Sequence, residues 1–250
     1  MIPAEFAYER ADSLDHALEL LAAHGPEAKV IAGGQSLLPL MKLRLARPDR
    51  LIDIGRLTEL RGVSVMPDGR LAIGALTTYA DLLGDARVAS LALIGDAVPF
   101  IGDVQVRNRG TVGGALAHAD PAGDLPAVFL ALGVELVCRS AERGERTLPI
   151  EGFLQGPFST GLDPDELVTE VRLPAASGSY GSAYRALRQQ ASGFAIAGVA
   201  VVIGRTAAAD DGAFDDVRIA VTGVGEVPYR AAAAEDRARG TTLEIGRAHV

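Results

Sequence analysis

The stretch KVIAGGQSLLPLMKLRLARPDRLIDI, residues 29–54, predicts how the first part of the chain folds. Lys29 to Ala32 is a short apolar strand that runs into the pair Gly33-Gly34. A helix capped by Ser36 is predicted to continue through Leu45, and Arg50 to Ile54 forms the next strand. A strand, a helix and a strand in this order favour parallel pairing through a right-handed crossover.

The residues before this stretch repeat the same pattern. Phe6 to Tyr8 is predicted to be a short strand, and Ser13 is placed to cap an apolar-periodic helix that ends at Gly25. Two successive units of this kind imply a small parallel sheet over residues 1–55.

Residues 56–174 are predicted to form a second unit of mixed, mostly antiparallel character. Pro67-Asp68-Gly69 is a turn signal between two short strands, and Thr78 is placed to cap a helix through Leu83. The other predicted elements of this unit are a helix over Leu125–Leu132 and strands over Val134–Arg139 and Leu167–Leu173.

Residues 175–244 are predicted to form a third unit after a small-residue linker, Ala175 to Ser179. Three strands and the start of a helix are expected here, over Tyr184–Arg188, Ile196–Ile203, Val217–Thr222 and from Ala231 onward. We expect this C-terminal unit to be incomplete. We also hypothesise that residues 245–250, IGRAHV, are a non-native tail translated from adapter DNA.

Composition excludes several classes of function. The net charge of -8 argues against nucleic acid as a partner, and no apolar run approaches the roughly 20 residues that span a bilayer. The first residues lack a secretion signal, so a cytoplasmic location is expected. Cys138 is the only cysteine, and the four histidines lack metal-ligand spacing, so we expect no metal site. Any redox chemistry therefore requires a bound organic cofactor.

The first glycine loop, Ala32 to Leu37, has a composition suited to binding phosphate. Adjacent glycines let an anion approach the backbone N–H groups, and the Ser36 hydroxyl adds a donor. An ordinary strand–helix turn with a serine cap has the same composition, so the loop alone leaves both interpretations open. It lacks the further glycine and the lysine of a P-loop, and it does not match G-x-G-x-x-G, which disfavours a nucleotide triphosphatase.

The second glycine-rich segment, QVRNRGTVGGALAHADPAGD, residues 105–124, shows neither helical nor strand periodicity. Long irregular segments in compact domains are often functional. A structural loop between subdomains is the alternative, and a lone histidine such as His118 is more often structural than catalytic. Cys138 is expected to be a packing residue in an apolar strand.

Together, residues 32–54 and 105–124 resemble the two FAD-binding signatures of the medium subunit of aerobic carbon monoxide dehydrogenases, which is similar to the flavin domain of xanthine dehydrogenase. The resemblance extends to about Thr242 and includes IGALTTYADL and DELVTEVRLP. It implies an α+β, PCMH-type FAD-binding fold. An N-terminal parallel α/β unit and a middle unit with an antiparallel sheet would bind FAD, and a three-stranded sheet with helices would follow.

The resemblance also implies which residues contact FAD. The first loop would cradle the diphosphate, the second would lie along the cofactor, and the remaining positions match a carboxylate, a residue near the flavin ring, a backbone contact and a basic residue. These positions are Ala32, Gly33, Gly34, Gln35, Ser36 and Leu37; Thr111, Val112, Gly113, Gly114 and Ala115; and Asp124, Ile101, Val168 and Arg188. Gln35 stands where some relatives have histidine, and Ser192-Gly193-Phe194 replaces the more usual Gly-Asp-Phe.

As the resemblance implies, the chain is an electron-transfer subunit with no catalytic residue of its own. Its expected partners are a large molybdenum-cofactor subunit and a small [2Fe–2S] subunit, assembled as a dimer of heterotrimers. FAD would pass electrons from the clusters to an external acceptor. The alternatives are a stand-alone FAD-dependent oxidase of related fold and a non-catalytic scaffold subunit. Neither the substrate nor the acceptor follows from the sequence.

Overall fold

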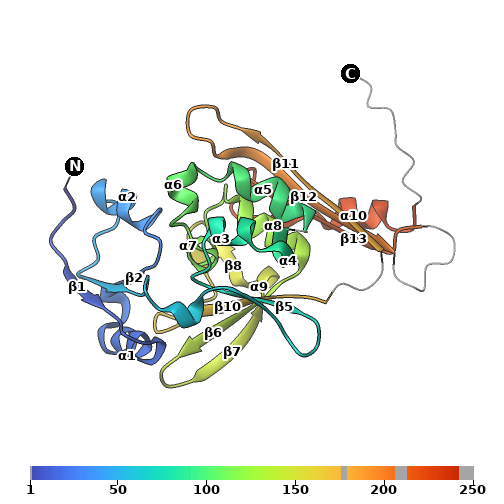
Figure 1. Ribbon diagram of the computed structural model, residues 1–250. Helices are drawn as coiled ribbons and strands as arrows, with labels where there is room; N and C mark the ends of the chain where they lie inside the picture. Colours follow the sequence, from blue (N-terminus) through green and yellow to red (C-terminus); the bar gives the residue numbers. More distant parts are fainter. Residues whose placement is uncertain (1, 90, 176–178, 206–212, 242–250) are drawn as a thin grey trace.

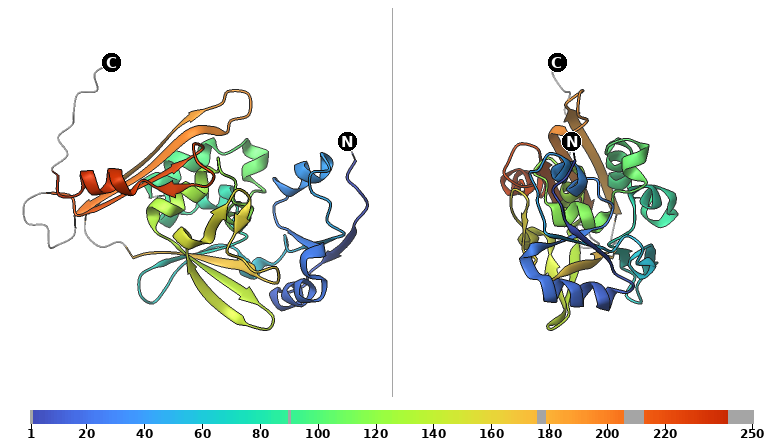
Figure 2. Two further views of the ribbon diagram at one scale, coloured as in Figure 1. Left: turned by 180° about the vertical axis from the view of Figure 1, so that it is seen from behind. Right: turned by 90° about the vertical axis from the view of Figure 1, so that its left-hand side faces the viewer.

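A computed structural model describes residues 2–89, 91–175, 179–205 and 213–241. The N-terminal unit lies at one end of the molecule, and the C-terminal sheet lies along the opposite upper edge (Figure 1). Helices of the middle unit fill the space between them, and the view from behind shows the same order (Figure 2). The proposed tail, residues 245–250, and the centre of the predicted linker lie outside the described residues.

The N-terminal unit is the predicted parallel sheet. Its strands are ordered β1-β3-β2, and both β1 and β2 pair with β3 in parallel. Ser13 caps α1 as predicted, because its hydroxyl accepts the His16 N–H at 3.1 Å. The elements are β1 (Ala7–Arg10), α1 (Leu14–His24), η1 (Gly25–Glu27), β2 (Ala28–Ile31), α2 (Leu37–Lys42) and β3 (Arg50–Asp53).

The middle unit contains a five-stranded antiparallel sheet in the order β4-β5-β10-β6-β7. The predicted hairpin at residues 63–73 and the helix capped by Thr78 are both present, and the cap is reciprocal because Asp81 accepts the Thr78 N–H. The strands are β4 (Val63–Val65), β5 (Leu71–Gly74), β6 (Glu135–Ser140), β7 (Gly144–Pro149) and β10 (Leu167–Leu173). A short hairpin of β8 (Leu154–Gly156) and β9 (Ser159–Thr160) lies between β7 and β10 in the chain.

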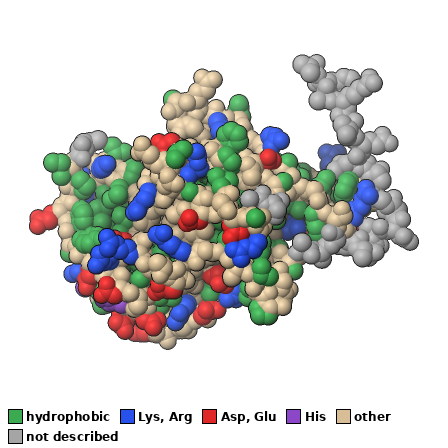
Figure 3. All heavy atoms as spheres, in the orientation of Figure 1, with side chains coloured by type: hydrophobic (Ala, Val, Ile, Leu, Met, Phe, Trp, Pro, Cys, Tyr) green, Lys and Arg blue, Asp and Glu red, His purple; other side chains and the backbone are tan. Residues whose placement is uncertain are grey.

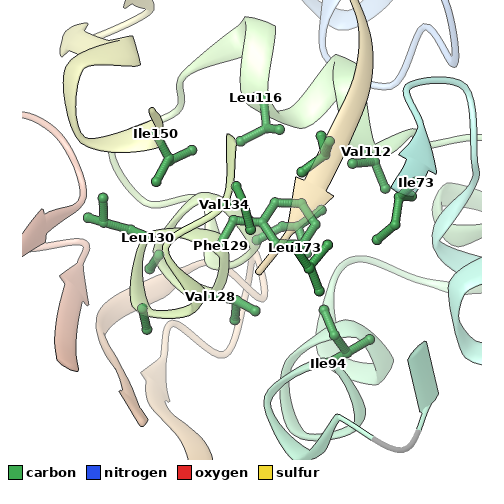
Figure 4. Packing of buried hydrophobic residues seen from close by; sticks show 14 of the residues in the cluster. Ile73, Ile94, Val112, Leu116, Val128, Phe129, Leu130, Val134, Ile150 and Leu173 are labelled. Carbon is green, nitrogen blue, oxygen red and sulfur yellow. The ribbon is translucent and has the colours of Figure 1, made fainter. Parts of the chain in front are cut away.

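Most of the short helices of this unit share one core with the sheet, in which Phe129 of α8 is fully buried. Val112 and Leu116 of α7 lie in the same core as Ile73 of β5 (Figure 4). The helices are η2 (Thr58–Leu60), α3 (Tyr79–Gly84), α4 (Ala86–Ala89), α5 (Ala92–Ala97), η3 (Val98–Phe100), α6 (Val104–Arg107), α7 (Val112–His118), α8 (Asp124–Leu132) and α9 (Ile150–Phe153).

The prediction that residues 105–124 are irregular was wrong. Half of this segment lies in α6 and α7, and Thr111 caps α7. Its glycines and alanines hide the helical period, because they are small enough to be buried on several sides and give no apolar stripe. Gly113, for example, packs so closely that a β-carbon there would lie 2.6 Å from the Ala75 Cβ.

The C-terminal sheet has four strands in the order β11-β12-β13-β14, and not the three that were predicted. The fourth strand has only two residues, too few to show an alternating pattern. Helices α5 and α8 of the middle unit pack against this sheet. The elements are β11 (Ser179–Arg188), β12 (Ala195–Arg205), β13 (Asp216–Thr222), β14 (Tyr229–Arg230) and α10 (Ala232–Ala238).

Two hydrophobic cores hold the units together. The N-terminal core is built on α1 and β3, but it also contains Leu60, Leu76 and Leu167 from the middle unit. Val168, the next residue of β10, belongs to the main core instead. Successive residues of a strand point to opposite faces, so β10 contributes to both cores. Among the described residues, no helix has the length and apolar character needed to cross a membrane. The cytoplasmic location stays a prediction.

Candidate functional site between two glycine segments

The first glycine loop connects β2 to α2 and touches the second glycine segment. Gly34 adopts the left-handed region with φ +74°, which glycine reaches without strain. At Gly33 a β-carbon would lie 2.0 Å from the backbone oxygen of Arg109. Only glycine therefore allows this approach, and two segments that are far apart in sequence meet here.

Backbone N–H groups of this loop are free. Gly33, Gly34, Gln35 and Ser36 donate no backbone hydrogen bond to any residue that the structure describes. Ser36 precedes α2 as predicted, but its backbone is already helical and its hydroxyl makes no cap hydrogen bond. The Gln35 side chain is exposed and reaches back to the Gly33 carbonyl at 3.4 Å. Unpaired backbone donors beside glycines are what an anion requires, so the loop fits a phosphate group.

The second glycine segment has no such free donors where α7 begins. Thr111 accepts the Gly114 N–H at 3.1 Å, and the N–H groups of Val112 and Gly113 donate to the carbonyls of Thr77 and Ala75. The first turn of α7 is therefore satisfied by the protein itself. The predicted residues Thr111, Val112 and Gly113 are buried, Ala115 is half-buried, and Gly114 is exposed. This segment supplies a closely packed wall rather than a set of donors.

A narrow cleft of about 20 Å³ lies where the two segments meet. Residues of the N-terminal unit form one side, and residues that precede α3 and α7 form the other. The lining consists of Ala32, Gly33, Gly55, Arg61, Leu76, Thr78, Asn108, Arg109 and Thr111. The structure thus brings the two predicted glycine segments together at one site.

A buried ion pair links two further predicted residues, Asp124 and Arg188. The Arg188 guanidinium donates to both carboxylate oxygens of Asp124, at 3.0 and 3.1 Å. The Tyr184 hydroxyl also donates to Asp124, and it is almost fully buried. Burial raises the pKa of Tyr184, and the negative charge of Asp124 raises it further. The hydroxyl therefore stays protonated and acts as a donor.

The ring of Phe100 and the residue after it, Ile101, lie beside this cluster. The Arg188 guanidinium lies 5.6 Å from the centre of the Phe100 ring, which is 59% exposed. The side chain of Ile101 is half-buried against the main core, and its carbonyl accepts from Arg107 at 3.2 Å. Ile101 thus offers only part of its side chain to a ligand.

Tyr79 supports the second glycine segment, and its N–H donates to the Gly110 carbonyl at 3.1 Å. Its ring is buried, and a β-carbon on Gly110 would lie 2.8 Å from it. Burial raises the pKa of Tyr79, and the charge of Asp124 adds to the effect. The Tyr79 ring therefore packs directly against Gly110 of the second glycine segment.

Val168 lies deeper in the protein than its predicted role suggests. Its side chain is 6% exposed and belongs to the main core, so only its backbone remains for a ligand. The Gly113 N–H donates to the Ala75 carbonyl at 2.8 Å, and the Ala75 N–H donates to the Thr169 carbonyl at 2.9 Å. These two bonds connect the strand that carries Val168 to the second glycine segment.

Neither Tyr184 nor Tyr79 was identified as a site residue from the sequence. A signal for Tyr184 was present, because Tyr184 and Arg188 lie four residues apart in a strand and therefore share a face. Nothing local predicted Tyr79, whose position depends on the packing of α3 against the second segment.

His118 has protein neighbours on two sides, and its structural role stays a prediction. Its ring lies 5.0 Å from that of Phe158, and Asp120 is 4.0 Å from its Nε2 atom. Burial lowers the pKa of His118, and Asp120 opposes this effect. Cys138 is fully buried, which confirms its packing role. Within the described ranges, no group of His, Cys, Asp and Glu could hold a metal ion.

Comparisons with known proteins identify the family. Residues 4–176 match the family described as "FAD binding domain in molybdopterin dehydrogenase", and residues 182–246 match "CO dehydrogenase flavoprotein C-terminal domain". The chain belongs to the FAD-binding subunits of the molybdenum hydroxylases. The fold and the family expected from the two glycine signatures are thereby confirmed, and this FAD-binding subunit is part of an oxidoreductase.

Relatives of this FAD-binding subunit serve different enzymes. The glyceraldehyde dehydrogenase medium chain of Sulfolobus acidocaldarius is 40% identical over 97% of this chain and 84% of its own length. The carbon monoxide dehydrogenase medium chain of Hydrogenophaga pseudoflava is 41% identical over 92% of this chain and 78% of its own. A solved structure of carbon monoxide dehydrogenase from the same organism superposes with a TM-score of 0.91 at 41% identity, covering 98% of this chain and 84% of that one.

Proposed function

We propose that this subunit holds FAD at the junction of the two glycine segments and carries electrons between its partners and an external acceptor. When bound, FAD supplies a group that exchanges electrons singly or in pairs. The protein's own residues bind and orient the cofactor, and none of them forms a covalent bond to a substrate. No nucleophile–base pair is needed for this function.

The observation that carries the proposal is the set of free N–H groups from Gly33 to Ser36 beside the cleft. A diphosphate accepts several hydrogen bonds, and this loop offers donors that nothing in the described chain uses. Gly33 and Gly34 leave room for close approach. The remaining first-loop positions, Ala32, Gln35 and Leu37, would line the path of the cofactor.

Residues of the second segment would form the opposite wall. Because the first N–H groups of α7 are already bonded, this segment, Thr111 to Ala115, would contact the cofactor mainly through the exposed Gly114 and the half-buried Ala115. The buried Thr111, Val112 and Gly113 would hold that surface in place. We further propose that Ile101, Asp124, Val168 and Arg188 contact FAD, as their match to the family pattern implies. Asp124 and Arg188 are bonded to each other, so they would contact the flavin either by exchanging this bond for one to the cofactor or through atoms that the ion pair leaves exposed.

The partners are proposed from the family. A small subunit with [2Fe–2S] clusters would donate electrons, a large molybdenum-cofactor subunit would oxidise the substrate, and the complex would be a dimer of heterotrimers. Relatives named for glyceraldehyde and for carbon monoxide show that closely similar medium chains serve different substrates. These names support our proposal that the substrate is determined outside this chain, in the large subunit.

The test is the visible spectrum of the purified full-length chain, followed by heat release of the chromophore. Flavin bands near a one-to-one ratio, with free FAD released, support the proposal. A folded, colourless protein that ignores added FAD contradicts it and leaves the scaffold alternative. A flavin that stays covalently attached favours a stand-alone oxidase instead.

A further inference from the structure

Arg61 lies at the junction of the N-terminal and middle units, directly beside the cleft. It follows η2, and its Nη2 atom donates to the carbonyl of Gly55 at 2.8 Å. Gly55 lines the cleft together with Ala32 and Gly33 of the first glycine loop. The guanidinium is therefore held at the edge of the loop that carries the free N–H groups.

Arg61 carries a positive charge that no carboxylate neutralises within the described part of the chain. Neither Arg61 nor Arg109, the other arginine of the cleft, lies within 4.0 Å of an Asp or Glu oxygen there, and no acidic residue lines the cleft. Twelve other arginines of the described chain do form such ion pairs, among them Arg50 and Arg188. The cleft is thus a locally positive site on a chain of net charge -8.

The acidic groups that share a cavity with Arg61 have other partners. Arg61 also lines a larger cavity of about 320 Å³, together with Asp81 and Asp85, but neither carboxylate forms an ion pair with it. Asp81 accepts the Thr78 N–H at 3.0 Å, and Asp85 pairs with Arg87. Both carboxylates therefore have their own partners, and Arg61 remains available to an anion in the cleft.

The carboxylate of Asp53, two residues before Gly55, also has hydrogen-bond partners of its own. Its two oxygens accept the Gly55 N–H at 2.8 Å and the Tyr8 hydroxyl at 2.5 Å. In Figure 3, Lys and Arg side chains lie across the middle of the face with some Asp and Glu side chains among them, and further Asp and Glu side chains lie at the lower left.

We propose that Arg61 selects ligands that carry a diphosphate. The loop N–H groups donate hydrogen bonds but have no net charge, so they discriminate weakly between an anion and a neutral group. A guanidinium adds charge-assisted hydrogen bonds, which are about twice as strong as neutral ones. Arg61 thereby makes the cleft prefer FAD to riboflavin, which has the same ring system but no phosphate. This inference rests on the proposed FAD site.

The test measures flavin binding by Arg61→Gln and by the wild type, both as full-length chains from which bound flavin has been removed. Glutamine removes the charge and keeps a polar side chain, but it is too short to replace the Nη2 bond to the Gly55 carbonyl. The riboflavin titration and Arg61→Lys therefore separate the loss of charge from general damage to the site. Arg61→Lys keeps the charge, and Arg56→Gln removes a charge from a neighbouring exposed arginine that does not line the cleft. FAD and riboflavin are titrated separately at low and at moderate salt, with flavin fluorescence as the readout.

In Arg61→Gln we expect the affinity for FAD to fall about tenfold, the loss of one charge-assisted contact. Its dependence on salt should also weaken, because fewer charges are screened. The affinity for riboflavin should stay unchanged. Arg61→Lys should retain most of the preference for FAD, and Arg56→Gln should match the wild type. The rise in Tm on adding FAD should shrink in Arg61→Gln alone.

Equal FAD affinity in the wild type and Arg61→Gln overturns the inference. So does an equal loss for FAD and riboflavin, which would indicate general damage to the site, or an equal effect of Arg56→Gln, which would indicate a long-range field. A folded wild-type chain that binds no FAD at all contradicts the proposed function instead. The two failures are therefore distinguishable.

Discussion

The backbone oxygen of Arg109 occupies the space that a β-carbon on Gly33 would need, with 2.0 Å between the two positions. This contact joins the loop after β2 to the segment before α7, and it defines one side of the cleft. Backbone atoms cannot be moved aside as a flexible side chain can. The spacing of the two segments therefore depends on the absence of a side chain at residue 33.

Substitution of Gly33 by alanine is expected to separate the two segments and to abolish FAD binding while the overall fold persists. Flavin content after purification measures the first effect, and far-UV circular dichroism measures the second. Gly152→Ala is the matched control, because a β-carbon there meets nothing within 4 Å. Full flavin content in Gly33→Ala would show that the contact is dispensable.

Removal of the Tyr184 hydroxyl is expected to destabilise the protein by about 1–3 kcal/mol. Asp124 is buried, and in Tyr184→Phe it loses one of its three donors while Arg188 keeps its two bonds. Urea unfolding followed by circular dichroism measures the change. Tyr229→Phe, at a half-exposed position, should leave the midpoint in place. An unchanged midpoint in Tyr184→Phe would mean that the buried carboxylate does not need the hydroxyl.

Thr222 should be more sensitive than an exposed threonine. Its hydroxyl lies 2.9 Å from the Pro121 carbonyl and 3.0 Å from the Gly123 carbonyl, so β13 holds the segment that leads into α8. Thr222→Val keeps the shape and is expected to cost about 1–3 kcal/mol in unfolding free energy. Thr147→Val, on the exposed strand β7, is the control. Equal stability of the two variants would contradict the role of the hydroxyl.

Protonation of His118 should weaken the fold below neutral pH. Burial lowers its pKa in the folded state below the ordinary value of 6.5, so the unfolded chain binds the proton more readily. Stability should therefore decrease as the pH falls through about 6.5, and this decrease should level off below the folded pKa. His118→Gln should reduce the difference between urea midpoints at pH 7.5 and 5.5. Identical differences in both proteins would argue against this effect.

Cys138 is expected to be inert in the native protein. Burial raises the pKa of its thiol to about 12, and Glu166 adds to this effect. The thiolate is the reactive form, and the sulfur lies inside the main core. A thiol reagent such as Ellman's should therefore react only after denaturation. Rapid labelling of the folded chain at pH 7 would contradict the buried position.

Local signals predicted most of the fold. Ser13, Thr78 and the turn at residues 67–69 have short-range partners, and each begins or ends an element where the sequence indicated. The first turn of α7 has partners in Ala75 and Thr77, which are far away in sequence, so no local pattern could reveal it.

The sequence predicted the glycine segments of the candidate site, but it did not predict the residues that pack around them. The two glycine segments are adjacent, as the family resemblance implied, and Asp124 pairs with Arg188. The Tyr184 hydroxyl meets Asp124 across 60 positions of the chain, and Arg61 reaches the cleft through a contact to a backbone carbonyl. Such contacts follow from tertiary packing, which composition and spacing do not encode.

The division of β10 between two cores has a consequence for biosynthesis. Leu167 completes the apolar interior of the N-terminal unit, although the ribosome adds it long after the first glycine loop. A nascent chain that ends before β10 would expose the apolar surface that Leu167 covers, and surface of this kind attracts chaperones or other chains. The cofactor is therefore expected to load after translation has passed β10, so that flavin uptake reports on a finished chain rather than guiding its folding.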